Sequence, residues 1–195
     1  MRLVLASASP RRLDLLARIG VVPDAVIPAE IDETPRPREL PGHYAARMAA
    51  EKAAAIAAPD ALILAADTVV AVGRRILPKA ESDAEARAAL GLLSGRRHRV
   101  YSAVTLIDLA GVARHRLSLT LVTFKRLSEA DLESYIASGE WRGKAGAYAI
   151  QGIGAFAVAR IEGSYANVVG LPACEVIVAL RSAGLLGRFP LQARP

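Results

Sequence analysis

The stretch that decides the fold is "LASASPRRLDLLARIG", residues 5–20, in which a short apolar strand stops at Ser-Ala-Ser-Pro and a helix follows. Ser9 suits the N-cap of this helix, Pro10 suits its first position and Gly20 suits its end. An apolar face is predicted at Leu13, Leu16 and Ala17. A strand that turns sharply into a helix in this way is the opening of an α/β fold.

Two arginines, Arg11 and Arg12, stand in the first turn of the predicted helix. A helix N-terminus carries about half a positive charge, so a cation there costs a few tenths to about 1 kcal/mol. A bound anion would remove this conflict. With the free backbone N–H groups and the hydroxyls of Ser7 and Ser9, the arginines predict a phosphate cradle. The alternative is a solvated helix start with both arginines in water.

Helices and strands are expected along the whole chain. We expect helices over 10–19, 43–57, 82–93, 128–139 and 172–183. We expect a strand at 2–6, an extended stretch at 25–32, one or two strands in 61–73, two strands within 99–127 joined at Asp-Leu-Ala-Gly, and a strand at 154–161 before a turn at Glu-Gly-Ser-Tyr. Because a hairpin interrupts the alternation of strands and helices, the fold class is α/β with a mixed twisted sheet flanked by helices, in one domain over 1–195.

The composition excludes several classes of protein. With 53% hydrophobic residues in 195, the chain is not disordered. No apolar run approaches the roughly 20 residues of a membrane span, and "LVLA" is too short for the core of a signal peptide, so we expect a cytoplasmic protein. The single cysteine, Cys174, lies in the apolar run "ACEVIVAL" and is predicted to be a buried structural thiol.

The basic residues are mostly arginine. The net charge is +6, and only four of the 25 basic residues are lysines: Lys52, Lys79, Lys125 and Lys144. In a chain that uses arginine so often, a lysine indicates a position that requires a compact ammonium instead of a guanidinium. "GRRHR", residues 95–99, is the one candidate basic patch, and without interleaved aromatic residues it favours a solvated loop or an anion contact over an RNA platform.

Lys52 falls on the apolar face of a predicted helix. That face consists of Ala45, Met48, Ala49, Lys52 and Ile56. A lysine in this place either extends its ammonium to the solvent edge or points into a cleft as a phosphate ligand.

Asp67 interrupts the apolar run "LILAADTVVAV". An unpaired buried carboxylate costs several kcal/mol, so Asp67 must be paired, bound to a metal, or placed with Thr68 in a turn where the strand leaves the core. Asp32 and Glu33 form a second acidic group just after a predicted strand that ends near residue 32, in a loop stiffened by prolines. Two carboxylate sites suit Mg²⁺, which takes one or two carboxylates and completes its shell with water and phosphate oxygens. The histidines are too scattered to predict zinc.

The stretch "GKAGAYAIQGIGAF", residues 143–156, places Lys144 and Gln151 among four glycines. Glycines allow a ligand to approach the backbone closely, and the Gln151 amide carries both a donor and an acceptor. The alternative is an ordinary flexible connection, since the order of the glycines matches no known phosphate-binding loop.

Eight segments of the chain, in order from about residue 2 to 182, resemble the Maf-type nucleotide pyrophosphatases, also called septum-formation-inhibitor-like proteins. They are "LASASPRR", "EIDE", "EKA", "AADT", "ILPKA", "SGRRHRVYSAV", "GKAGAYAIQG" and "GSYANVVGLP". The resemblance implies one α/β unit with two lobes around a cleft, and a metal-dependent enzyme that cuts nucleoside triphosphates to the monophosphate and pyrophosphate. Ser7, Arg11 and Arg12 match the family's phosphate-binding loop. The family's acidic and basic site residues match Glu33, Lys52, Asp67 and Lys79.

The resemblance also implies a cofactor and partners. Mg²⁺ or Mn²⁺ would be held by Asp67 or Glu33 together with a nucleoside triphosphate substrate, and Asp67 is the candidate for activating water. No membrane and no stable nucleic acid partner are expected, and a homodimer is left open. The chain departs from the family's pattern in placing Pro78 before Lys79 and in having Gly143 where an acidic residue is usual.

At Arg11, Thr68 and Gln151 the chain resembles the branch of the family that acts on dTTP and UTP, whereas the branch that acts on 7-methyl-GTP has Trp, Gln and Glu there. A glutamine amide can accept from the N3–H of uracil or thymine and donate to a ring carbonyl. Lys144 is predicted to bind substrate as well.

The rival interpretation, from the basic charge and the family's name, is a non-catalytic nucleic-acid-binding regulator of septum formation.

Overall fold

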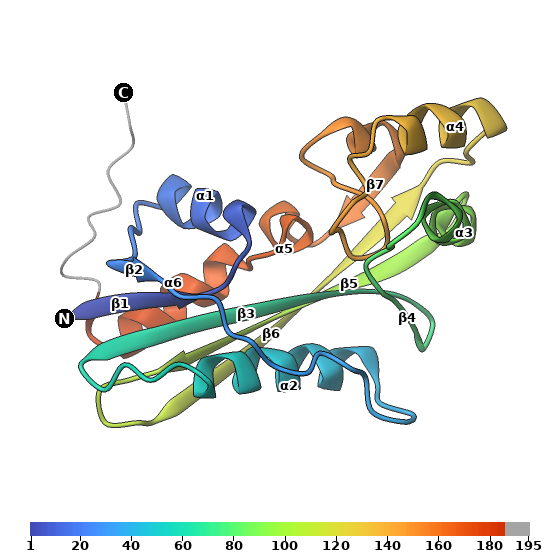
Figure 1. The fold of residues 1–195 in the computed structure, drawn as a ribbon. Helices are drawn as coiled ribbons and strands as arrows, with labels where there is room; N and C mark the ends of the chain where they lie inside the picture. Colours follow the sequence, from blue (N-terminus) through green and yellow to red (C-terminus); the bar gives the residue numbers. More distant parts are fainter. Residues whose placement is uncertain (186–195) are drawn as a thin grey trace.

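The structure, a computed structural model, describes residues 1–185, so the part of the expected 1–195 domain at 186–195 lies outside the described residues. Its centre is a seven-stranded sheet in the order β2-β1-β3-β5-β6-β7, with β4 paired to β3 (Figure 1). The strands are β1 Arg2–Ala6, β2 Ala25–Val26, β3 Ala61–Val72, β4 Arg75–Leu77, β5 Arg97–Ile107, β6 Ala113–Phe124 and β7 Val158–Glu162. β1 is parallel to β2 and β3, and the other pairs are antiparallel, which confirms the predicted mixed sheet.

Helices cover both faces of the sheet. They are α1 Pro10–Arg18, α2 Pro41–Ala54, α3 Asp83–Leu93, α4 Glu129–Ala137, α5 Tyr165–Val169 and α6 Ala173–Ser182, with a 3₁₀ turn η1 at Ile153–Ala157. In Figure 1, α2 runs along one side of the long strands β3, β5 and β6, and α1, α5 and α6 lie on the other side, where α5 and α6 contact β5 and β6. α3 and α4 pack against each other at the far end of the sheet. Within residues 1–185, none of the helices has the length and apolar character to cross a bilayer.

β1 shows how the sequence fills both layers. Successive side chains of a strand point to opposite faces. Leu3 and Leu5 pack in the cluster that holds Leu16 of α1 and Leu180 of α6, whereas Val4 packs in the cluster that holds Ala53 of α2 on the other face. A strand buried on both faces reads as one continuous apolar run, as "LVLA" does.

Two expectations about secondary structure were wrong, and one short helix was not expected. The extended stretch at 25–32 is a strand only at Ala25–Val26, because the prolines that follow cannot donate to a ladder. The strand expected at 154–161 begins as η1 and becomes β7 only at Val158. The turn expected at "EGSY" leads into a short helix, α5, whose cap Ser164 accepts from the N–H of Asn167.

Two expectations about burial were also wrong. Cys174 is exposed, because α6 turns Val176, Ala179 and Leu180 inward and leaves Cys174 on the opposite side. In α1 the buried side chains are Leu15 and Leu16, whereas Leu13 is 38% exposed. Ser9 does take the N-cap position of α1, but its side chain makes no capping hydrogen bond.

Candidate active site

The site lies where the middle of β3 lacks a strand partner on one edge. β1 pairs with β3 as far as Ala65, and β4 pairs with it from Val70 onward. Asp67 and Thr68 lie in the gap between these two partners, close to the carboxyl end of β1. Ligands of α/β sheets bind at such ends, where the connections diverge. Asp67 is therefore inside a strand and not at its terminus, which excludes the turn that the sequence left open.

A cleft of about 340 Å³ opens at this gap. One wall is the turn from β1 into α1, and the other contains residues 142–145 and Gln151. The structure brings together all the site residues expected from the sequence: Ser7, Arg11, Arg12, Glu33, Lys52, Asp67, Thr68, Lys79, Lys144 and Gln151. Their placement around one cleft is a structural fact, and their chemical roles stay predictions.

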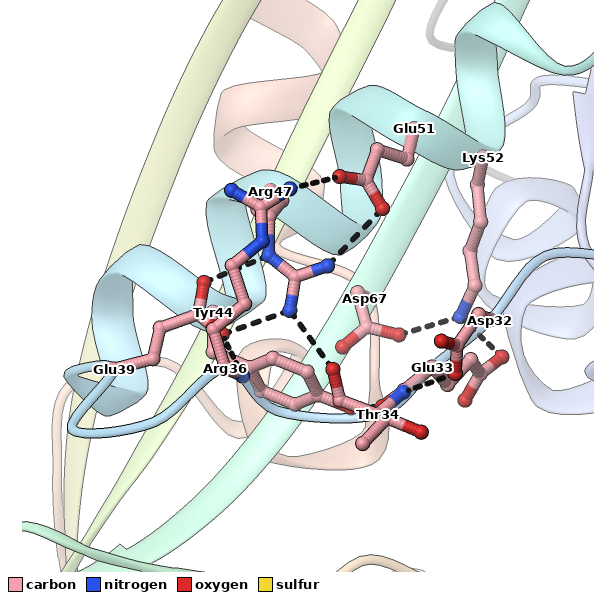
Figure 2. Close-up of polar contacts among 10 residues, drawn as sticks. All are labelled: Asp32, Glu33, Thr34, Arg36, Glu39, Tyr44, Arg47, Glu51, Lys52 and Asp67. Atoms are coloured by element: carbon pink, nitrogen blue, oxygen red, sulfur yellow. Dashed lines mark hydrogen bonds and ion pairs between the residues drawn. The ribbon is translucent and has the colours of Figure 1, made fainter.

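Lys52 joins the two carboxylates of the cleft (Figure 2). Its Nζ lies 2.7 Å from Oδ1 of Asp67 and 2.8 Å from Oε1 of Glu33. Lys79 approaches the same Glu33 from the other side, with its Nζ 3.5 Å from Oε2. Burial alone would raise the pKa of Glu33, but hydrogen bonds and charge from the two lysines lower it below its usual value.

α2 carries Lys52 to this position from its apolar face. The predicted neighbours on that face, Ala45, Met48 and Ala49, are all fully buried. Lys52 itself is only 7% exposed, so its ammonium points into the cleft and does not reach for the solvent edge. A buried ammonium needs an opposite charge, and Asp67 and Glu33 supply it.

Arg12 connects the start of the chain with the loop after α5. Its Nε donates to the carbonyl oxygen of Gly170 at 2.9 Å, and its terminal nitrogen donates to Oγ of Ser7 at 3.0 Å. Oγ1 of Thr68 donates to the same Gly170 oxygen at 3.2 Å. Burial lowers the pKa of Arg12, while the charges of Asp67 and Glu33 act in the opposite direction.

The cleft carries an excess of positive charge. Six cations line it, Arg11, Arg12, Lys52, Lys79, Arg142 and Lys144, against two carboxylates, Glu33 and Asp67. Burial, and then the neighbouring Arg11, lower the pKa of Lys144. Nε of Arg11 is buried and makes no hydrogen bond with any residue of 1–185. A polyanion is the ligand that this distribution of charge and donors suits best.

The carboxylates suit a magnesium ion that shares its shell with a substrate. Within residues 1–185 no group of three or more His, Cys, Asp or Glu is arranged to hold a metal, so an all-protein cage is absent there. Mg²⁺ does not need such a cage, because one or two carboxylates with phosphate oxygens and water complete its octahedron. Asp67 and Glu33, which converge on one ammonium, are a donor set of this kind.

Two features of the site were not expected from the sequence. Arg142 lines the cleft but stood out in no motif, and Tyr148 lines it as well, although it was given no role within the glycine-rich stretch 143–156. Glu140 fastens the backbone after Gln151, since its carboxylate accepts from the N–H groups of Ile153 at 2.8 Å and Gly154 at 2.9 Å. A Cβ on Gly152 would lie 1.8 Å from Oε1 of Glu140, so a larger residue there would push this carboxylate away from the N–H groups that it accepts from.

Known proteins with similar sequences cover nearly the whole chain. The family model described as Maf-like protein matches residues 2–183. A dTTP/UTP pyrophosphatase of Novosphingobium aromaticivorans is 57% identical over 94% of this chain and 92% of that protein. Proteins of the same name from Caulobacter vibrioides and Mesorhizobium japonicum are 56% and 51% identical, over 93% and 100% of this chain and 95% and 98% of those proteins.

Solved structures are more distant. A nucleoside-triphosphatase / dITP/XTP pyrophosphatase from Mycobacterium abscessus aligns with a TM-score of 0.44 and 16% identity, over 98% of this chain and 99% of that one. The family match and the curated relatives show which family the chain belongs to, without support from this solved structure. The chain belongs to the Maf-like protein family.

Proposed function

We propose that this chain is a nucleoside triphosphate pyrophosphatase that hydrolyses dTTP and UTP to the monophosphate and pyrophosphate. The curated relatives above carry this activity in their names and share more than half of their residues with the chain. The observation that carries the proposal is the cleft at the β3 gap, where Lys52 is bound between two carboxylates and cations line the surrounding walls.

Asp67 is the residue we assign to the attacking water. It lies on a rigid central strand, and Lys52 holds its Oδ1 in one orientation. A carboxylate that is fixed in this way can accept a proton from water without first reorganising. Glu33, on the opposite side of the same ammonium, completes the acidic pair.

A divalent cation fits the proposal. Asp67 and Glu33 would hold Mg²⁺ or Mn²⁺ together with the triphosphate, and the ion would stabilise the charge on the α-phosphate and on the leaving pyrophosphate. The cations of the cleft would neutralise the remaining negative charge of the triphosphate. We assign phosphate binding to Ser7, Arg11 and Arg12 at the start of α1, with Lys79 and Lys144 opposite them.

Base selection is assigned to Arg11, Thr68 and Gln151. The Gln151 amide can accept from N3–H and donate to a carbonyl of uracil or thymine, whereas a glutamate could only accept. The N1–H and exocyclic amine of guanine, which are both donors, suit a glutamate instead. One well-placed bidentate amide contact discriminates by about 1–3 kcal/mol, or roughly ten- to a hundredfold.

A nucleotide panel tests the proposal. Purified protein is incubated with dTTP, UTP and 7-methyl-GTP, and pyrophosphate is measured separately from inorganic phosphate. We expect kcat/KM for dTTP and UTP well above that for 7-methyl-GTP, and Gln151→Glu should narrow the difference. Arg160→Ala, a change of a cation that does not line the cleft, is the control and should leave the preference unchanged.

Other outcomes would contradict it. Preference of the wild type for 7-methyl-GTP would overturn the assignment of base selection. Absence of pyrophosphate with every nucleotide, together with binding of a nucleic acid, would instead favour the regulator of septum formation.

A further inference from the structure

The loop that carries Glu33 has no regular structure of its own. Residues 27–40, between β2 and α2, form neither helix nor strand. An irregular segment of this length in a compact domain needs contacts with other parts of the chain to hold one conformation. The structure places these contacts outside the cleft, on the neighbouring face of α2 (Figure 2).

Arg47 of α2 is the centre of these contacts. Its Nε and one terminal nitrogen donate to the two carboxylate oxygens of Glu39, each at 2.7 Å. The same terminal nitrogen donates to the carbonyl oxygen of Thr34 at 3.1 Å, and the other terminal nitrogen lies 3.1 Å from Oε2 of Glu51. One guanidinium therefore joins both ends of the segment 34–39 to the helix.

Glu39 and Tyr44 complete the attachment. Oε2 of Glu39 also accepts from the backbone N–H of Arg36 at 2.9 Å, which closes the loop upon itself. The side chains of Arg47 and Glu39 are only 14% and 10% exposed, and the bonds from Arg47 lower the pKa of Glu39 to about 2. The hydroxyl of Tyr44 donates to the carbonyl oxygen of Glu33 itself at 2.6 Å.

We propose that Arg47 is a positioning residue of the enzyme, which holds the loop 32–39 so that the Glu33 carboxylate stays at the Lys52 ammonium. The proposal rests on the proposed function. Arg47 does not line the cleft and acts only through Glu33. The ion pair between Arg47 and Glu39 is a bidentate one, which fixes direction as well as distance. A lysine in place of Arg47 could not make this bidentate pair, because an ammonium has no planar pair of donors.

Kinetics of five proteins test the proposal: wild type, Arg47→Ala, Arg47→Lys, Glu33→Gln and the double variant Glu33→Gln/Arg47→Ala. Displacing a reacting group by about 1 Å costs on the order of a hundredfold, so we expect Arg47→Ala to lower kcat for dTTP by about ten- to a hundredfold. The kcat of Arg47→Lys should lie between those of the wild type and Arg47→Ala. In the Glu33→Gln background, Arg47→Ala should lower kcat by less than about threefold, because residues that act through one another are not additive.

A matched control separates positioning from a general loss of stability. Arg114 makes a partly buried ion pair with Asp108 at the turn between β5 and β6, away from the residues that line the cleft. Arg114→Ala should therefore lower the melting temperature without lowering kcat. Wild-type kcat in a folded Arg47→Ala protein, or a full further loss on adding Arg47→Ala to Glu33→Gln, would overturn the proposal.

Hydrogen exchange gives a measurement that does not depend on activity. Peptides covering residues 30–40 should exchange their amides faster in Arg47→Ala and in Arg47→Lys than in wild type or Arg114→Ala. Unchanged exchange in both Arg47 variants would overturn the anchoring of the loop. A wild-type protein that releases no pyrophosphate from dTTP or UTP, while exchange in the loop still accelerates, would refute the proposed function and leave the anchoring supported.

Discussion

At the scale of single residues, the site depends on one buried ammonium that serves two carboxylates. Removing one partner of a buried ion pair is far more costly than its net contribution, because the other charge is left unpaired. Lys52 has two acidic partners, so neutralising one of them still leaves it a counter-charge. Substitutions at Asp67 should therefore affect chemistry more than folding.

We expect Asp67→Asn to lower turnover by about a hundredfold or more, because general-base assistance contributes typically ~10²–10⁴. Circular dichroism and thermal unfolding would show that the variant is folded, and pyrophosphate release under saturating dTTP would give kcat. Asp60→Asn, at an exposed aspartate paired with Arg2, is the control. Near wild-type turnover in a folded Asp67→Asn protein would remove Asp67 from the role of base.

At the scale of elements, local signals in the sequence predicted most helices and strands. A helix was expected over 128–139, and α4 begins at Glu129 behind a full capping box formed by Ser128 and Asp131. The hairpin joined at Asp-Leu-Ala-Gly is present as β5 and β6. α5 was missed because five residues are too few to show a helical period, and its position depends on the buried Asn167, which bonds β5 and β6.

Three residues of the site were predictable from the sequence because each breaks a local rule, whereas Lys79 was expected only from the resemblance to a known family. Asp67 interrupts an apolar strand, Lys52 an apolar helix face, and Arg11 opposes a helix dipole. Arg47 and Glu39 break no such rule, since charged residues on a helix and in a loop are ordinary. Only the folded chain shows that they meet.

The aromatic contacts of β5 predict a dependence of stability on pH. His98 is 1% exposed, packs edge-to-face on Phe124 and Tyr148, and lies with Nε2 2.9 Å from the Tyr148 hydroxyl. Burial lowers the pKa of His98 to about 4, whereas the unfolded chain protonates it near 6.5. Between these values the unfolded state binds the extra proton, so the free energy of unfolding should fall as pH falls, by about 1.4 kcal/mol per pH unit from this group.

Urea unfolding at pH 7, 6 and 5 would measure this effect. The difference in unfolding free energy between wild type and His98→Gln should shrink as the pH falls, because only the wild type loses this contribution. His43→Gln, at an exposed histidine, should keep the pH dependence of the wild type. A constant difference between wild type and His98→Gln across this range would show that His98 titrates normally in the folded protein.

At the scale of the whole molecule, the cleft has more positive than negative charge and lacks a complete metal cage among the described residues. We therefore expect EDTA to abolish pyrophosphate release, and Mg²⁺ or Mn²⁺ to restore it better than Ca²⁺, whose larger and looser coordination holds a triphosphate less well. The measurement is a titration of each cation into the chelated enzyme with dTTP. Full activity in excess chelator would exclude the ion.

The carbonyl of Gly170 has a consequence for how the chain folds during its synthesis. It accepts from Arg12, 158 positions earlier, and from Thr68, 102 positions earlier. A ribosome makes a protein from its N-terminus, so Arg12 and Thr68 are synthesised well before the carbonyl that they bond, and the cleft cannot close around them until Gly170 has been made. A nascent chain that stops short of Gly170 therefore holds Arg12 and Thr68 without the acceptor that joins them, and its cleft is incomplete.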